Sequence, residues 1–291
     1  MLFEGVHRTT YRYSAPVFLE PHVIRLRPRS DPRQAIHNFS LRISPEPDGI
    51  TEGTDPYGND VAWAWFSGTH SSLEIQTAFS VETLRENPYD FIVPTLEAAA
   101  VPPVYPESDR PALFPYMTPV DGSARELAEE IAASVDGEVV PFLREMASRI
   151  HATHEYIFRP EGDPLPPAVT LGAAQGSCRD LAWLFVEACR TIGIAARFVS
   201  GYAGDEPSTQ HELHAWGAAY VPGAGWRGYD PSLGLAVTNR HVTLAAAATP
   251  AGASPVDGNF RGSGVVAELT SEIELQTSPS SRNSAAPDHV P

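Results

Sequence analysis

The chain of 291 residues contains no lysine, so all 20 of its basic residues are arginine. It has only two cysteines, and no run of apolar residues approaches the ~18 that a membrane-spanning helix needs. Acidic residues outnumber basic ones, and the formal net charge is -16. This balance argues against a nucleic-acid or anionic membrane partner, because phosphate binding requires clustered positive charge. Without lysine, the chain offers no side-chain amine to an isopeptide-forming reaction.

The two cysteines, Cys178 and Cys189, lie in one predicted helix, about 16 Å apart along its axis at the usual rise per residue. A disulfide needs Cα atoms within about 7 Å, so these two residues cannot pair. Unpaired cysteines are compatible with a reducing compartment. The chain begins with charged and polar residues where a signal peptide would be apolar, and we therefore expect a cytoplasmic protein. The oligomeric state does not follow from the sequence.

Composition and turn chemistry divide the sequence into four parts. Residues 1–85 contain short alternating apolar and polar runs separated by Pro-, Asp- and Gly-rich turns, which predicts an antiparallel β-sandwich. Residues 86–120 are a proline-rich linker, whose aromatic residues indicate that it docks rather than moves freely. Residues 121–276 show helical periodicity followed by strands. Residues 277–291 lack a pattern, which predicts a disordered tail.

Within the third part we expect two amphipathic helices and then a helix from Cys178 to about Ile192, which Gly193 ends. The strands that we expect after it are Ala196–Tyr202, Leu213–Val221, Trp226–Tyr229, one ending at Val242-Thr243-Leu244, and Val265–Leu275. The predicted fold class is therefore α+β: a sandwich followed by a core in which the cysteine-bearing helix packs on an antiparallel sheet.

The segment Gly176-Ser177-Cys178-Arg179-Asp180 places a thiol at a helix start. Ser177 is a favourable N-cap, and Asp180 follows three residues later, which approximates a capping box. The helix dipole and the unpaired N–H groups of the first turn favour a thiolate at Cys178 and can stabilise an oxyanion. The alternative is a small buried core thiol, which is how we interpret Cys189.

Downstream, His214 opens a predicted strand and Asp230 closes its hairpin partner. A thiol, an imidazole and a carboxylate in this order suggest a nucleophile, its base and the group that orients the base. Both side chains share a face only if the index sum of paired residues is even, as with Val221 opposite Gly225. We also expect Trp216 and Trp226 to form apolar walls that bind substrate.

A metal site is the competing interpretation. His211 and His214 form an H-x-x-H pattern that Cys178 or Asp230 could complete. However, residues three apart at a strand start point to opposite faces, and the neighbourhood has no second cysteine and no Glu-containing zinc motif. We therefore predict neither a metal nor a cofactor, and we expect His211 to be a solvent-facing loop residue.

Four motifs resemble the bacterial transglutaminase-like proteins, which share the papain-like cysteine-enzyme fold. They are Gly176–Asp180, Gly193–Tyr202, His214-Ala215-Trp216 and Gly225–Pro231. Thr10-Tyr11-Arg12-Tyr13 and Asp55-Pro56-Tyr57-Gly58-Asn59 also resemble the β-rich N-terminal region that accompanies this core. The resemblance implies that Cys178, His214 and Asp230 occupy the triad positions of the family.

Two segments depart from the family pattern. The approach to the cysteine is Ala174-Gln175-Gly176 rather than Arg-rich, and Ala246–Ala251 replaces a polar Gly-Arg-Asp-Tyr segment. The first hypothesis is a cysteine peptidase or amidase that passes a thioester to water. Alternatives are a protein-glutamine transglutaminase, a small-acyl transferase, and a non-enzymatic binding module on the same fold. The expected partner is a peptide or protein substrate.

Overall fold

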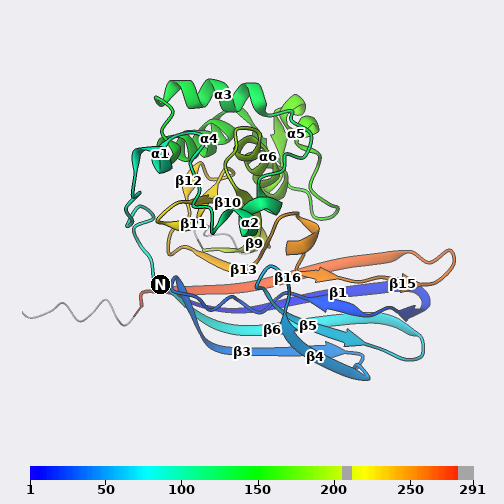
Figure 1. The fold of residues 1–291 in the computed structure, drawn as a ribbon. Coiled ribbons are helices and arrows are strands. Elements are labelled where there is room, and N and C mark those ends of the chain that lie inside the picture. Colours follow the sequence, from blue (N-terminus) through cyan, green and yellow to red (C-terminus); the bar gives the residue numbers. More distant parts are fainter. Residues whose placement is uncertain (205–211, 281–291) are drawn as a thin grey trace, which may run out of the picture.

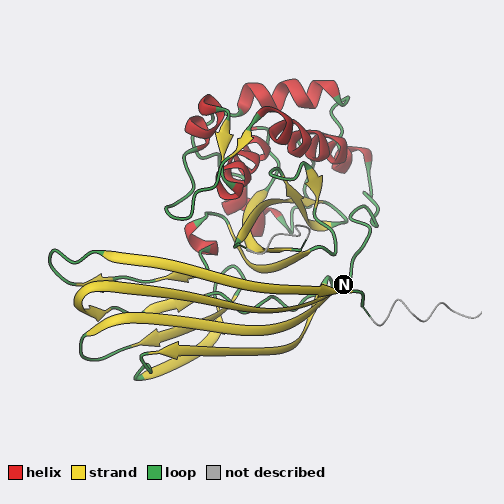
Figure 2. Cartoon of the chain, turned by 180° about the vertical axis from the view of Figure 1, so that it is seen from behind, coloured by secondary structure: helices red, strands yellow, loops and turns green. Residues whose placement is uncertain are grey.

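The computed structural model describes residues 1–204 and 212–280 and places them in two bodies (Figures 1 and 2). A layered β-body lies below a rounder body in which helices cover a curved sheet (Figure 1). The fold class is α+β, as the sequence predicts. Within the two described ranges, no helix is both long and apolar enough to cross a bilayer.

Two antiparallel sheets form the lower body. One has the strand order β15-β1-β6-β3 with β16 also paired to β1, and the other has the order β14-β2-β5-β4. The strands are β1 (Leu2–Leu19), β2 (His22–Ile24), β3 (Gln34–Ser44), β4 (Gly49–Thr54), β5 (Asp60–Trp65), β6 (His70–Thr83), β14 (Val256–Asp257), β15 (Phe260–Arg261) and β16 (Ala267–Ser278). Phe3 and Leu73 of the first sheet and Ile24 and Ala64 of the second belong to one buried cluster. The predicted N-terminal sandwich is confirmed.

Strand β16 corrects the predicted division of the chain. We expected the strand over Val265–Leu275 in the helical body, but β16 pairs with β1 of the sandwich from Tyr13↔Ala267 to Leu2↔Ser278. Ile273 and Leu275 are buried in the sandwich cluster, and this burial holds the returning strand there. Thr277 and Ser278, expected in a disordered tail, belong to this strand, and residues 281–291 of that predicted tail lie outside the described residues.

The segment 86–120 lies against the upper body. It contains α1 (Leu96–Ala99), α2 (Arg110–Leu113) and the 3-10 helix η1 (Phe114–Tyr116). The hydroxyl of the buried Tyr105 accepts the N–H of Ala195 at 2.8 Å and donates to the carbonyl oxygen of Tyr220 at 3.3 Å. The prolines prevent a continuous helix, and contacts of this kind with distant parts of the chain hold the segment in place.

The upper body is built around helix α6, which contacts three other helices and two strands of a five-stranded antiparallel sheet with the order β12-β11-β10-β9-β13. The helices are α3 (Arg125–Ser134), α4 (Val139–Thr153), α5 (Pro167–Ala173), α6 (Cys178–Thr191) and the 3-10 helix η2 (Ala251–Ala253). The strands of the sheet are β9 (Ala196–Ala203), β10 (His214–Val221), β11 (Gly225–Asp230), β12 (Leu235–Ala236) and β13 (His241–Ala247), and β7 (Glu155–Tyr156) pairs in parallel with β8 (Gln175–Gly176).

Helix α6 is buried on all sides except at Arg179. A helix in such a position must satisfy its charged side chains internally. The carboxylate of Glu187 accepts the N–H groups of residues 120–122 at the end of the linker. The guanidinium of Arg190 donates to the carbonyl oxygens of Ala196 and Ala248. These bonds fix α6, and with it Cys178, relative to the sheet.

Two buried amide side chains of the sandwich hold strand β13 of the core by its backbone. Asn59 donates from Nδ2 to the carbonyl oxygen of Ala246 at 3.1 Å and accepts the Ala246 N–H at 2.8 Å. Gln34 bonds the carbonyl oxygen and the N–H of Thr243 in the same way, both at 2.8 Å. We call Gln34 and Asn59 the amide clasp. The two bodies therefore meet through directional hydrogen bonds as well as apolar contact.

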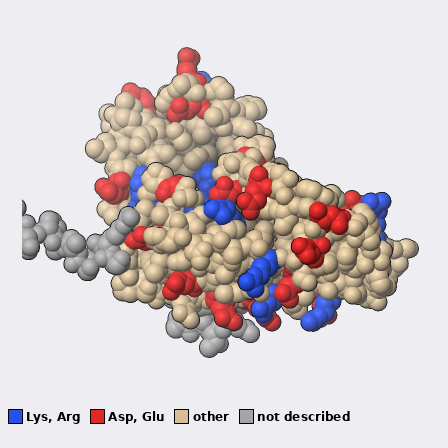
Figure 3. Space-filling model, turned by 90° about the horizontal axis from the view of Figure 1, so that it is seen from below, with Lys and Arg blue, Asp and Glu red and all other residues tan. Residues whose placement is uncertain are grey.

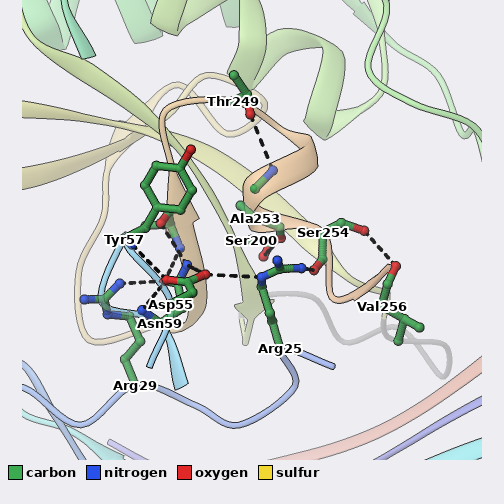
Figure 4. Close-up of polar contacts among 12 residues, drawn as sticks. Arg25, Arg29, Asp55, Tyr57, Asn59, Ser200, Thr249, Ala253, Ser254 and Val256 are labelled. Atoms are coloured by element: carbon green, nitrogen blue, oxygen red, sulfur yellow. Dashed lines mark hydrogen bonds and ion pairs between the residues drawn. The ribbon is translucent and has the colours of Figure 1, made fainter. Parts of the chain in front are cut away.

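Charged groups surround Asn59, one of the two residues of the amide clasp. Figure 4 shows Asp55 between Asn59 and Arg25, with an Arg25 Nε to Asp55 Oδ2 distance of 3.3 Å. Arg25 also donates to the carbonyl oxygen of Ser254 at 3.2 Å. On the face of the molecule seen from below, basic and acidic side chains are interspersed (Figure 3). Charge on that face is therefore mixed. Asp55 balances Arg25, which in turn bonds the segment that follows η2 at Ser254.

Candidate active site

Cys178 is the first residue of α6, as the capping pattern predicts. The Asp180 carboxylate accepts the backbone N–H of Ser177 at 2.8 Å and the Ser177 hydroxyl at 2.7 Å. A Cβ on Gly176 would lie 2.8 Å from the Cβ of Asp180, so a residue without a side chain is required there. The helix start is therefore rigid, and the thiol occupies a defined place.

Asp180 is held from outside the helix as well. Nη1 of Arg159 bonds both of its carboxylate oxygens at 2.6 and 2.7 Å, and the N–H of Leu165 donates at 2.7 Å. Burial alone would raise the pKa of this carboxyl, but the bonds from Leu165, Arg159 and Ser177 outweigh burial and hold the pKa below its usual range. Asp180 is thus an ionised anchor for the turn that carries Cys178.

The Cys178 side chain lies at a cleft of about 370 Å³ between the two bodies. Only 7 % of Cys178 is exposed. The upper body contributes Tyr156, residues 158–164 and the start of β10, and the sandwich contributes residues of β1 and β16, including Tyr11 and Leu269. Cys178 is therefore neither an enclosed core thiol nor a surface thiol, and residues of both bodies surround the space that it faces.

The hairpin of β10 and β11 has the register that the sequence analysis requires. Val221 pairs with Gly225 across a three-residue connection, so the index sum of paired residues is even. His214 and Asp230 consequently lie on one face at the same end of the hairpin. His214 Nε2 is 2.5 Å from Asp230 Oδ2. The predicted contact between imidazole and carboxylate is present.

The imidazole of His214 also faces the thiol. Burial alone would lower the pKa of His214, but the charge and hydrogen bond of Asp230, together with a hydrogen bond to Cys178, raise it well above 6.5. The Cys178 sulfur lies 4.0 Å from the carbonyl oxygen of Leu213, the residue before His214. The structure therefore places Cys178 and His214 at the wall of one cleft, with Asp230 buried behind His214.

Sequence reasoning missed the other groups around the Asp230 carboxylate. Oδ1 accepts the N–H of Ser232 at 2.9 Å and its hydroxyl at 2.6 Å, and His241 Nε2 lies 3.2 Å from Oδ2. Burial would raise the pKa of Asp230, but the charges and hydrogen bonds of His214 and His241 depress it strongly. The Asp-Pro-Ser turn could have revealed Ser232. His241 comes from β13, and no local pattern connects it to this site.

His214, Asp230 and His241 also form a set of metal-ligating side chains. One ligand atom of each lies within 4.8 Å of the others. Two imidazoles and a carboxylate are a donor set that zinc accepts. Here Asp230 Oδ2 lies within hydrogen-bond distance of both Nε2 atoms, so hydrogen bonding alone accounts for the arrangement. His211, the other candidate ligand, lies outside the described residues.

The prediction that Trp216 and Trp226 form the apolar walls of the substrate site is wrong. Trp216 and Trp226 do not line the cleft at Cys178. Trp216 is buried behind the site, where its ring contacts His241 at 5.3 Å and His214 at 6.2 Å between centroids. Trp226 pairs with Tyr220 near the turn of the hairpin, at the end opposite to His214. The register that joins His214 to Asp230 therefore places Trp226 far along the strand.

Other aromatic side chains stand in the cleft instead. Tyr156 and Phe158 of the upper body line it and are 49 % and 62 % exposed, and Tyr11 faces them from the sandwich. Pro250 and Ala251, at the end of the segment that departs from the family pattern, also line the cleft and contribute apolar surface. The cleft next to the thiol is consequently lined by aromatic and small apolar groups together with charged side chains such as Arg179 and Glu212.

Comparison with known proteins agrees with this architecture. Residues 5–82 match the bacterial transglutaminase-like N-terminal region, and residues 125–231 match the transglutaminase-like superfamily. The chain carries a transglutaminase-like core behind a bacterial transglutaminase-like N-terminal region. Cys178, His214 and Asp230 all lie inside the match to the transglutaminase-like core, whereas His241 lies beyond its end.

Two relatives span nearly the whole transglutaminase-like chain. An uncharacterized protein of Mycobacterium tuberculosis is 28% identical over 280 residues, which covers 88% of this chain and 86% of the relative. One of Mycobacterium leprae is 26% identical over 280 residues, which covers 91% and 97%. A structure from Cytophaga hutchinsonii, described as a candidate cysteine protease, has a TM-score of 0.72 at 21% identity and covers 97% of this chain and 92% of that one. This last likeness shows the shared fold of both bodies.

Proposed function

We propose that this transglutaminase-like protein is a cysteine hydrolase of peptide or carboxamide bonds, with Cys178 as nucleophile, His214 as acid and base, and Asp230 as the orienting group. The observation that carries the proposal is that His214 Nε2 lies 2.5 Å from Asp230 Oδ2, while His214 and Cys178 both line the same cleft. The helix start adds N–H groups without intrahelical acceptors.

The chemistry begins with proton transfer from the thiol to His214, whose raised pKa favours the imidazolium. The thiolate of Cys178 attacks the carbonyl carbon, and N–H groups of the first turn of α6 stabilise the oxyanion. The carbon–nitrogen bond breaks as His214 protonates the leaving amine. Water, deprotonated by His214, then attacks the thioester, which releases the acid and restores the thiol.

The shape of the cleft supports a peptide substrate. Its two walls come from different bodies, so an extended segment can lie between Tyr11 on one side and Tyr156 and Phe158 on the other. Aromatic side chains of this exposure provide apolar contact for substrate side chains. We favour water over an amine as the acceptor, because water needs no binding site of its own. Transamidation and small-acyl transfer remain the alternative outcomes of the test.

The two cysteines of the chain supply a matched experiment. Incubation with a panel of peptide amides, glutamine peptides and acyl thioesters, followed by intact-mass measurement, should reveal an acyl adduct on the wild type and on Cys189→Ala, and none on Cys178→Ala. Cys189 is fully buried, and burial raises the pKa of its thiol, so it should not react.

The same panel separates the alternatives. Release of free acid from peptide amides supports hydrolysis, whereas an adduct formed only from thioesters indicates small-acyl transfer, and a product bonded to an added amine indicates transamidation. Turnover that persists in Cys178→Ala, or a complete absence of adduct and turnover with every substrate, would refute the proposed nucleophile and leave a binding module as the better description.

A further inference from the structure

A second hollow, of about 60 Å³, lies beside the core sheet and away from the thiol cleft. Four arginines line it: Arg33 and Arg85 from the sandwich side, Arg197 from β9 and Arg227 from β11. They are a fifth of all the basic residues in a chain whose formal net charge is -16. Such a concentration of positive charge in one small space requires a physical explanation.

Arg197 is the most constrained of the four. It is 6 % exposed, and its guanidinium stacks over the ring of Trp226 at 4.2 Å. It pairs with Ala218 in the sheet, on the face that points away from α6. Burial and the nearby charges of Arg29 and Arg33 lower its pKa to about 9. Burial and the two arginines thus outweigh the favourable charge of Asp31, and the positive charge of Arg197 lacks full compensation.

Several buried polar atoms around the hollow have no hydrogen-bond partner in the described part of the chain. Nε of Arg197, Nε of Arg227 and Nη1 of Arg85 are buried without a hydrogen-bond partner among the described residues, and so is Nδ1 of His241, which also lines the hollow. Arg227 is 8 % exposed and stacks on the ring of Phe91 at 4.5 Å. An unpaired buried polar group typically costs about 1–3 kcal/mol, so several in one place call for a shared partner.

The carboxylate of Asp31, whose charge acts on Arg197, is already paired with Arg33. Asp31 accepts three bonds from Arg33, from its backbone N–H, Nε and Nη2, and so balances that arginine. Within residues 1–204 and 212–280, no carboxylate forms an ion pair with Arg85, Arg197 or Arg227. Three positive charges around the hollow are therefore not balanced by a described acidic side chain in contact with them.

The volume of the hollow and the guanidinium groups around it determine which class of ligand can bind there. One water needs about 10–15 Å³ of such space, so a hollow of about 60 Å³ holds a few waters or one compact ion, and excludes a nucleotide. Planar guanidinium groups fit the paired oxygens of an oxyanion. Three unbalanced charges favour a divalent ion over a singly charged carboxylate.

We propose that this hollow is a binding site for a small divalent oxyanion of the phosphate type, held by Arg197 with Arg85 and Arg227. The site is separate from the thiol cleft but lies next to it, because His241 lines the hollow and its Nε2 also contacts Asp230. The anion would thus neutralise the arginines and lie next to the residue that contacts the orienting carboxylate.

Calorimetric titration of the full chain with inorganic phosphate tests the proposal, with ionic strength held constant by chloride. Arg197→Met keeps an apolar chain over Trp226 and should weaken phosphate binding by about tenfold or more, since it removes charge-assisted bonds. Arg261→Met is the matched control, because Arg261 also stacks on an aromatic ring, at 4.5 Å from Phe18, but its side chain is largely exposed. It should bind phosphate as the wild type does.

Arg85→Gln is a second variant, at a residue that is only partly buried. It tests phosphate binding at the hollow if Arg197→Met does not fold. Weaker phosphate binding in either hollow variant, with Arg261→Met unchanged, supports the site. If the wild type, Arg197→Met and Arg85→Gln bind phosphate with equal affinity, the phosphate binds elsewhere, for example at the arginines of the thiol cleft. That result would overturn the proposal. Absence of phosphate binding by the wild type, or equal binding of acetate, would also overturn it.

Discussion

At the scale of single residues, the candidate site depends on how one buried carboxylate is shared. Asp230 Oδ2 lies within hydrogen-bond distance of two imidazoles, those of His214 and His241, while Oδ1 is occupied by Ser232. A carboxylate surrounded in this way stays ionised and cannot rotate. His214 is consequently held in one orientation, with its remaining nitrogen available to the thiol.

Replacing Asp230 by Asn should change the pH dependence of the reaction. Asp230 provides the main effects that raise the pKa of His214, whereas burial lowers it, so in Asp230→Asn the pKa of His214 should fall. The imidazolium would then be lost at lower pH, and the basic limb of kcat/KM should move to lower pH. We also expect kcat to fall on the order of 10³–10⁴-fold.

The measurement is a full pH–rate profile of both proteins, with Asp136→Asn as the control. Asp136 is exposed and has φ of 55°, a conformation that Asn tolerates well. A basic limb that stays in place in Asp230→Asn would contradict the role assigned to this carboxylate.

At the scale of elements, the site requires three neighbouring strands to approach closely. Gly201 of β9 pairs with His214 of β10 on one side and with Thr243 of β13 on the other. An added Cβ would lie 2.0 Å from the carbonyl oxygen of Val242 and 2.6 Å from the indole of Trp216. The missing side chain at Gly201 is therefore what lets Trp216 pack against both histidines.

Gly201→Ala should destabilise the fold by about 1–3 kcal/mol, because the extra methyl group forces backbone or indole to shift in a packed core. Denaturant unfolding gives this quantity directly. Gly172→Ala is the matched control: Gly172 is exposed in α5, no atom lies within 4 Å of its added Cβ, and alanine is the better helix former. Equal stability of the wild type and Gly201→Ala would contradict the packing argument.

At the scale of the whole molecule, the amide clasp couples the sandwich to the core. Asn59 is completely buried and satisfies both backbone groups of Ala246, and Gln34 does the same for Thr243. β16 adds a second link, because the chain leaves the core and returns to the sandwich. The cleft at Cys178 is formed between the two bodies, so its shape depends on this coupling.

Asn59→Ala should lower the free energy of unfolding by about 2–4 kcal/mol, because it leaves the N–H and the carbonyl oxygen of Ala246 buried without partners. Scanning calorimetry is the appropriate measurement, since loss of coupling should also broaden or divide the transition. Asn38→Ala, at an exposed position of β3, should change little. A midpoint in Asn59→Ala equal to that of the wild type would mean that the clasp does not hold the bodies together.

The sequence by itself determined those parts of the protein that depend on near neighbours in the chain. Ser177 and Asp180 specify the start of the helix through capping, and the turn residues after Val221 specify a hairpin, whose register the sequence left open and the structure supplied. Alternation over residues 1–85 specifies a sandwich. In each case the physical cause acts within one helical turn or across one hairpin.

Only the tertiary structure decided the features that depend on distant segments meeting. The return of β16 to β1, the contact of His241 with Asp230, the position of Trp226 and the collection of arginines around the second hollow each join residues from separate elements. No capping rule or periodicity specifies such long-range contacts. Many arrangements have the same local propensity, and the packing of the two bodies and the burial of polar groups select one of them.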